Sequence, residues 1–166
     1  MNRFYLPEIA NGSGPTPPVQ GAGETSYQRQ LFALMCDDPG QRRNPCAWYR
    51  PVALVAQARC EAMGRYGWFE HHLDQRGHGP NWWIRQAGIS LPDGYGQSND
   101  SNNVESLGLN YQTPQECWQG WLDSPTHRAH VLTFAEQTLV GVGFWQGFDK
   151  WPNYWCVISV PDMRKT

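Results

Sequence analysis

The chain has 166 residues, which suffices for one domain with a single core and is too short for two ordinary domains. Its net charge of −2 provides no basic field to hold a phosphate backbone, so the composition argues against a nucleic-acid-binding protein. Aromatic residues make up 13% of the chain, which excludes disorder for most of it. No apolar stretch approaches the roughly 20 residues that a membrane-spanning helix needs.

Residues 1–25 predict an extended N-terminal arm. The part from residue 11 to residue 24 is rich in Gly, Pro, Ser and Thr, so it cannot form a helix and has little to bury. Neither the apolar core nor the small-residue cleavage site of a secretory signal is present. We expect the arm to lie against its own domain or a neighbouring subunit, and residues 26–166 to form the domain.

Five cysteines are an odd number, so at least one is free or pairs with another chain. Cys36 and Cys46 bracket a loop containing Pro and Gly that a local disulfide would close, with a contribution of about 3 kcal/mol. Cys60 and Cys156 lie in apolar runs and are interpreted as buried free thiols. The absence of a C-x-x-C pair argues against a zinc ribbon and a thioredoxin-type site.

The first half of the domain predicts three helices. Residues 26–36 place Tyr27, Leu31 and Leu34 on one side of a short helix. Pro51 occupies an N1 position and begins the longest helix, which extends to residue 69 with a weak end at Gly67. Pro80 begins another helix that Gly88 stops, and residues 71–79 and 89–103 are loops.

The second half predicts two more helices and a hairpin. Thr113 and Glu116 form a capping box with proline at N1, which predicts a helix from residue 114 to about residue 123. Ser124 and Pro125 cap a further short helix. Residues 138–145 and 153–160 alternate or are rich in β-branched and aromatic side chains, so they predict two strands joined as a hairpin. Helices ahead of a small antiparallel sheet make an α+β layered domain.

Several short motifs follow one another in a specific order. Phe69-x-His71 closes the long helix, Gln86-Ala87-Gly88 ends the next one, and the segment 103–108 contains Glu105. Trp121 to Leu132 then reads W-L-D-S-P-T-H-R-A-H-V-L, and Gly141-Val142-Gly143 and Tyr154-Trp155 follow in the hairpin. Each motif alone is weak, but the ordered set is specific. Over residues 28–160 it resembles the CAP superfamily (cysteine-rich secretory, antigen 5 and pathogenesis-related proteins, or SCP-like domains), and its bacterial branch most closely.

This resemblance implies a three-layer α-β-α sandwich with a central cleft. In many members two His and one or two Glu face the cleft, and some members hold a divalent metal there. By position, the cleft residues here are His71, Glu105 and His127. Two imidazoles and one carboxylate suit zinc and leave a fourth position for water, whereas without metal a Glu beside a His forms a proton-transfer pair.

The sequence departs from the family pattern at two positions. Ser124 stands where eukaryotic members carry a second Glu, which weakens an acid/base role. Ser106 replaces the Asn of the usual Gly-Glu-Asn and removes an amide that would orient Glu105. A purely structural alternative is that Glu105 only pairs with a cleft His. His72 and His130 are expected to point to solvent, although His130 could also share a face with His127 as a second ligand.

The tryptophans divide into two groups. Trp82, Trp83, Trp118 and Trp121 occupy helical positions and are expected to pack in the core and at its rim. Trp145, Trp151 and Trp155 cluster at the final hairpin, where an exposed aromatic patch would mark a protein partner or a sugar surface.

We therefore expect mainly a non-enzymatic binding module, acting as an accessory or structural subunit of an extracellular or virion-type assembly. It would dock onto other protein subunits through residues 1–25 and the aromatic hairpin, and a polysaccharide or lipid ligand is a further option. The alternative is a metal- or His/Glu-dependent hydrolase that uses His71, Glu105 and His127. No nucleophilic Ser or Cys has a convincing base, which argues against acyl-transfer catalysis.

Overall fold

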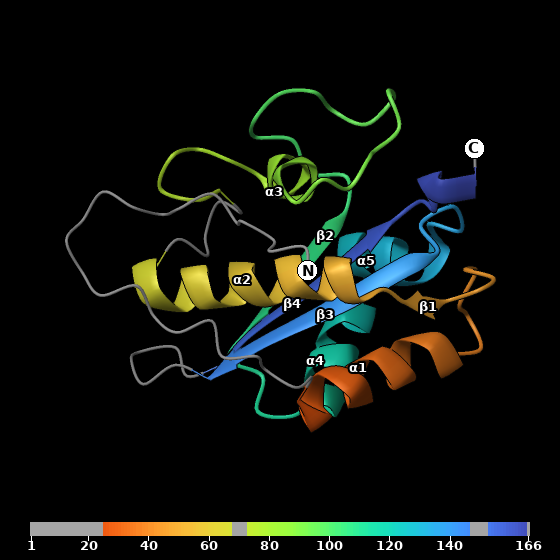
Figure 1. Cartoon of the computed structure of the whole chain (residues 1–166). Helices are drawn as coiled ribbons and strands as arrows, with labels where there is room; N and C mark the ends of the chain where they lie inside the picture. Colours follow the sequence, from red (N-terminus) through yellow and green to blue (C-terminus); the bar gives the residue numbers. More distant parts are fainter. Residues whose placement is uncertain (1–24, 68–72, 147–152, 166) are drawn as a thin grey trace.

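The computed structural model describes residues 25–67, 73–146 and 153–165 (Figure 1). The predicted arm, apart from Thr25, lies outside the described residues. The helical elements are α1 (Ser26–Asp37), α2 (Arg50–Tyr66), α3 (Pro80–Gln86), α4 (Pro114–Asp123), α5 (Pro125–Arg128), the π-helical turn η2 (Ala129–Thr133) and the 3-10 turn η3 (Met163–Lys165). The strands are β1 (Ala47–Trp48), β2 (Glu105–Leu109), β3 (Leu139–Gln146) and β4 (Asn153–Val160).

Helix ends follow the local sequence signals. Helix α2 stops at Tyr66 because Gly67 adopts a left-handed conformation with φ of 67° and donates its N–H to the Met63 carbonyl. At α4 the Thr113 hydroxyl accepts from the N–H of Glu116, as predicted. The Glu116 carboxylate, however, accepts from the N–H of Gln112, so the predicted reciprocal capping box is only half formed.

The sheet has the strand order β1-β3-β4-β2. The predicted hairpin is confirmed, because β3 and β4 pair antiparallel from Leu139 opposite Val160 to Gln146 opposite Asn153. Strand β2 pairs antiparallel with β4, whereas β1 pairs parallel with β3. The predicted antiparallel sheet is formed by β2, β3 and β4, and the short β1 adds a parallel pairing that makes the whole sheet mixed. The two residues of β1 enter it in parallel because the chain turns from β1 directly into α2.

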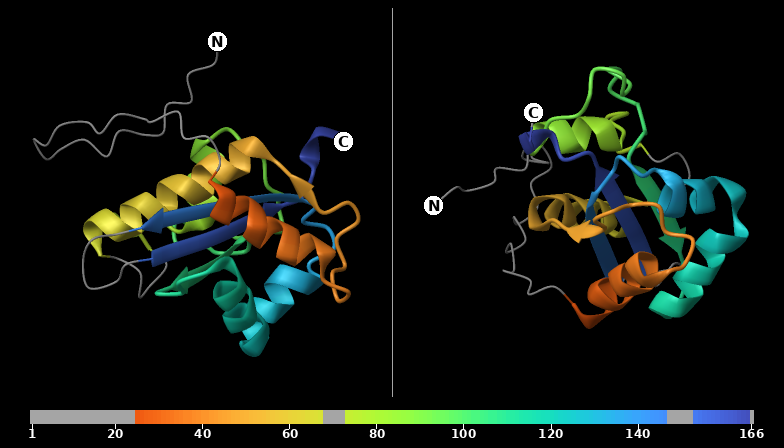
Figure 2. Two further views of the ribbon diagram at one scale, coloured as in Figure 1. Left: turned by 90° about the horizontal axis from the view of Figure 1, so that it is seen from below. Right: turned by 90° about the vertical axis from the view of Figure 1, so that its right-hand side faces the viewer.

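Helices cover both faces of this sheet, which confirms the three-layer arrangement (Figure 2). In β4, Cys156 and Ile158 face the core shared with α2 and α3, and Trp155 and Val157 face the core shared with α1, α4 and η2. This alternation follows from the two-residue period of a strand. Trp155 is fully buried, so it belongs to the core and cannot contribute to the exposed aromatic patch expected at the hairpin.

Two glycines allow α2 to approach the sheet closely. A Cβ atom at Gly141 of β3 would collide with the backbone of Ala53, and one at Gly143 would collide with the backbone of Ala56. The G-V-G motif therefore has a packing role: it removes side chains from the face of β3 beneath α2.

Among the described residues, no helix has both the length and the apolar character to cross a lipid bilayer.

Candidate functional site

Glu105 begins β2 and points toward α2, where it meets Arg59. The Arg59 Nε donates to Glu105 Oε1, and Nη2 donates to Oε2 over 2.8 Å, so the two groups form a two-point ion pair. Both side chains are 0% exposed. Burial by itself lowers the pKa of Arg59, but the charge and hydrogen bonds of Glu105 outweigh burial and raise it above its ordinary value.

Cys156 and Asn102 also contact Glu105. The Cys156 thiol donates to Oε1 over 3.2 Å, and the backbone N–H of Glu105 donates to the Asn102 side chain over 3.0 Å. Asn102 thereby orients the start of β2, although not the carboxylate itself. Because Glu105 already bonds a buried guanidinium, its negative charge is balanced inside the protein.

An aspartate–histidine pair lies near this ion pair, in the loop between α2 and α3. Asp74 Oδ2 is 3.4 Å from His78 Nδ1, and Asp74 Oδ1 accepts the backbone N–H groups of Arg76 and His78. The indole N–H of Trp83 donates to Asp74 over 3.2 Å. Asp74 also contributes to the charge that acts on Arg59. The sequence interpretation missed this pair because it treated residues 71–79 only as a polar loop.

His78 is held flat against Trp82, with ring centroids 3.8 Å apart and planes inclined by 7°. Its side chain is 16% exposed, so the imidazole remains reachable from solvent. Nδ1 of His78 is buried and forms no hydrogen bond with the described residues, so the Asp74 carboxylate acts on the ring through its nearby charge, and the stack on Trp82 sets the orientation of the ring. His78 and Asp74 can therefore transfer protons to or from a molecule in solution, whereas Glu105 is fully buried.

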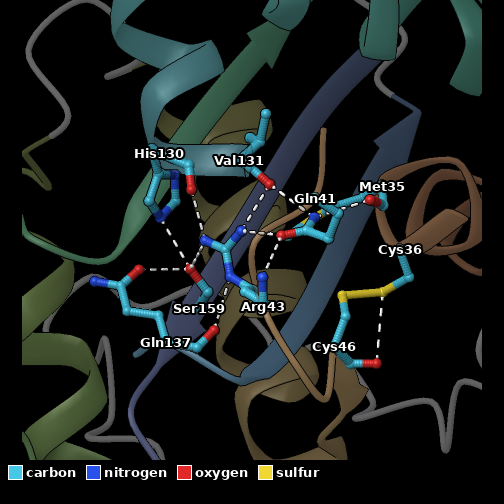
Figure 3. Close-up of a disulfide and its surroundings, with 9 residues drawn as sticks. All are labelled: Met35, Cys36, Gln41, Arg43, Cys46, His130, Val131, Gln137 and Ser159. Atoms are coloured by element: carbon cyan, nitrogen blue, oxygen red, sulfur yellow. Dashed lines mark hydrogen bonds between the residues drawn. A yellow bond between two sulfur atoms is a disulfide. The ribbon is translucent and has the colours of Figure 1, made fainter. Parts of the chain in front are cut away.

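His130 is buried, and the expectation that it points to solvent is wrong. Its Nδ1 lies 2.7 Å from the Ser106 hydroxyl. Its Nε2 lies 3.0 Å from the Ser159 hydroxyl, a contact drawn in Figure 3. Ser159 donates its single proton to Gln137 over 2.7 Å. It therefore accepts from Nε2–H of His130, and Nδ1 accepts from Ser106. This pattern describes a neutral imidazole.

Arg43 reaches into the same region from the loop closed by the disulfide. Its guanidinium donates to the carbonyls of His130, Val131 and Gln137 and to the Ser159 hydroxyl (Figure 3). Burial lowers the pKa of Arg43 to about 10. Burial, followed by the charge of Arg43, lowers the pKa of His130 to about 3. The predicted Cys36–Cys46 disulfide is confirmed and closes the loop that carries Arg43.

The other cysteines bear out the sequence interpretation. Cys60 and Cys156 are buried free thiols, and so is Cys117. Burial raises the pKa of Cys117 and Cys156 well above the ordinary value, which keeps both as unreactive thiols.

The structure places the predicted cleft residues as follows. His71 lies outside the described residues. Glu105 faces the α2 layer, whereas His127 lies on α5 in the opposite helical layer, where its Nδ1 is 2.9 Å from the Ser124 hydroxyl. Ser124, the residue in place of the family's second Glu, thus contacts His127. In the described ranges 25–67, 73–146 and 153–165, no three His, Cys, Asp or Glu side chains gather closely enough to hold a metal ion. The three-residue site stays a prediction.

Two solved structures share this arrangement. An extracellular protein of Bacillus anthracis that contains an SCP domain aligns with a TM-score of 0.57 and 21% identity, over 80% of this chain and 40% of that one. An outer surface protein of Borrelia burgdorferi aligns with a TM-score of 0.61 and 14% identity, over 81% of this chain and 92% of that one. The chain has a CAP-like fold. At these identities the likeness concerns the fold alone, and the chain spans only 40% of the length of the Bacillus protein. No protein-family model and no curated protein sequence matches the chain.

Proposed function

We propose that this CAP-like domain is a binding module that works outside the reducing cytosol. The observation that carries the proposal is the state of Glu105: the carboxylate expected to serve the cleft is 0% exposed and is held at two points by Arg59. A buried carboxylate with a permanent cationic partner has a structural role and is a poor metal ligand or general base.

Two observations support an extracellular or particle-surface location. A disulfide such as Cys36–Cys46 persists in oxidising compartments and is rare in the cytosol. The two structures with the same fold are described as an extracellular protein and an outer surface protein. The partner we propose is another protein subunit of a surface or virion-type assembly, contacted through residues 1–25 and the end of the hairpin near Trp145.

The metal content of the full-length chain tests this proposal. The protein is equilibrated with zinc, passed through a desalting column and analysed for bound metal, with His71→Ala and His127→Ala as matched variants. A binding module retains far less than one zinc per chain in all three proteins. A hydrolase of the cleft type retains about one zinc in the wild type and loses it in both variants.

The alternative, a hydrolase, is favoured by one specific observation, the Asp74–His78 pair with its partly exposed imidazole. An imidazole close to a carboxylate and reachable from solvent is a common general base. Its test is the hydrolysis of a simple activated ester by the wild type and by His78→Gln, with His127→Gln as control. A rate above background that disappears only in His78→Gln supports the hydrolase, and equal rates in all three proteins exclude it.

A further inference from the structure

Helices α1 and α4 pack against each other in the layer opposite α2, and a shallow groove of about 460 Å³ runs along their seam (Figure 1). Its α1 wall consists of residues that recur at the spacing of one helix face: Gln30, Ala33, Leu34 and Asp37. From α4 come Gln115 and Trp118. The centre of the groove is apolar, because Ala33 is exposed, Leu34 is half-buried and Trp118 forms a floor that is 7% exposed.

The shape of the groove suits a helix better than a small molecule. Sites for small molecules bury most of the ligand surface, whereas the wall residues Gln30, Ala33 and Asp37 are themselves exposed. From Gln30 to Asp37 the wall extends over about two helical turns, or roughly 10 Å. A third helix fits such a seam by laying side chains at positions i, i+3 and i+4 between the two helices.

The charge of the lining specifies what borders the apolar face of that helix. Asp37 and Asp38 line the groove at the end of α1, and the lining contains no Lys, Arg or His. In the part of the chain that the structure describes, neither carboxylate forms an ion pair, and Asp38 accepts the N–H of Gly40 over 2.7 Å. Both lie at the negative end of the α1 dipole, where a cation is favoured.

The remainder of the two helices has the same sign of charge. Glu116 and Asp123 of α4 are exposed acidic residues, and α4 contains no basic residue. The single basic residue of α1 is Arg29, whose guanidinium lies 4.1 Å from the ring centre of Trp48, outside the groove lining. The groove is therefore an apolar seam on an acidic pair of helices.

Resting on the proposed function, which gives the domain a protein partner, we propose that this groove binds one amphipathic helix of another protein subunit. The apolar side chains of that helix lie along Leu34 and over Trp118. Lys or Arg side chains border its apolar face and pair with Asp37 and Asp38. A helix bordered by Asp or Glu is excluded, because like charges then meet at the end of α1.

The experiment is an NMR titration of the full-length chain with a synthetic peptide of about 14 residues, roughly the shortest length at which an isolated helix forms in water. The peptide has Leu on one helix face and Lys on the other, and a matched peptide has Glu in place of every Lys. We expect the Leu/Lys peptide to bind saturably and to shift the amide signals of Ala33, Leu34 and Asp37. The Leu/Glu peptide is expected to bind about tenfold more weakly.

Two pairs of variants locate the binding site. Ala33→Arg fills the exposed middle of the groove and abolishes binding, whereas Gln119→Arg, exposed on α4 outside the lining, leaves it unchanged. Asp37→Lys weakens binding about tenfold at low salt, and added salt reduces this difference because it screens exposed charges. Asp93→Lys makes the same charge change at an exposed loop position outside the groove and has a much smaller effect.

Three results overturn the inference: no saturable binding of the Leu/Lys peptide, equal binding of the Leu/Glu peptide, or equal losses in Asp37→Lys and Asp93→Lys. Light scattering tests a second copy as the occupant, because wild-type dimers that Ala33→Arg dissociates contradict a helix of another subunit. A circular-dichroism melt establishes that each variant is folded. Because zinc content is measured separately, failure of this inference is distinguishable from failure of the proposed function.

Discussion

Acidification is expected to destabilise the domain through His130. The ring is buried between Ser106 and Ser159, and burial together with Arg43 lowers its pKa to about 3, whereas an unfolded chain has an ordinary histidine pKa of about 6.5. Between these values the unfolded state binds more protons than the folded state. The contribution of His130 to the free energy of unfolding is therefore fully present above about pH 6.5, and it is lost as the pH falls toward 3.

The size of the effect follows from the two pKa values. Each pH unit within this window costs about 1.4 kcal/mol, so acidification from pH 7 to pH 5 removes about 2 kcal/mol and the whole window removes on the order of 5 kcal/mol. The assay is urea unfolding followed by tryptophan fluorescence at pH 7, 6 and 5. His130→Asn lowers stability at pH 7 but removes most of the pH dependence, because its side chain does not titrate.

The control is His127→Asn, which leaves the buried ring and its two serine partners in place. It is expected to retain most of the wild-type pH dependence. If His130→Asn loses the same free energy between pH 7 and pH 5 as the wild type, His130 is not the buried neutral imidazole that its hydrogen bonds describe.

Three further variants test the contacts that hold the fold together. Glu105→Gln removes the charge opposite Arg59 and is expected to lower the free energy of unfolding by about 3–5 kcal/mol, measured in urea. Serine at both Cys36 and Cys46 opens the disulfide loop and is expected to cost about 3 kcal/mol in the same assay. Gly141→Ala forces α2 away from β3 and is expected to cost about 1–3 kcal/mol, seen as a lower melting temperature.

Each of these predictions has its own control. Replacing both Arg59 and Glu105 by apolar residues of similar size restores much of the stability, and a Glu105→Gln chain as stable as the wild type contradicts the buried pair. Gly94→Ala adds a methyl group where nothing lies within 4 Å, so it should not lower the melting temperature. An equal effect at Gly94 and Gly141 contradicts the close approach of α2. For the disulfide, a reducing agent should destabilise the wild type and leave the double serine variant unchanged.

The sequence predicted the elements whose signals are local. Pro51 and Gly67 mark the ends of the longest helix, and alternation in residues 138–145 and 153–160 marks the hairpin. It did not predict β1 or β2, because a two-residue strand has no periodicity and β2 is interrupted by Gly108. β1 forms because it pairs with β3, and β2 forms because it pairs with β4. Such pairing joins distant parts of the chain, so no local sequence pattern predicts it.

Partners of buried polar groups could not be predicted for the same reason. His130 was expected at the surface because the family pattern does not need it, yet Ser106, Ser159 and Arg43 satisfy it from distant parts of the chain. Glu105 was identified as important, but its partner Arg59 lies 46 residues away in a helix whose pattern reads as ordinary core. The sequence did offer one signal for this ion pair: Arg59 stands among the apolar positions of α2, where a charged side chain needs a buried partner.

The most direct test of the central claim is a crystal structure of the full-length chain soaked in zinc, with an anomalous difference map at the zinc edge. We predict that Glu105 remains bonded to Arg59 and that no zinc peak lies beside its carboxylate. A zinc ion bound jointly by His71, Glu105 and His127, with Arg59 displaced, would contradict the account.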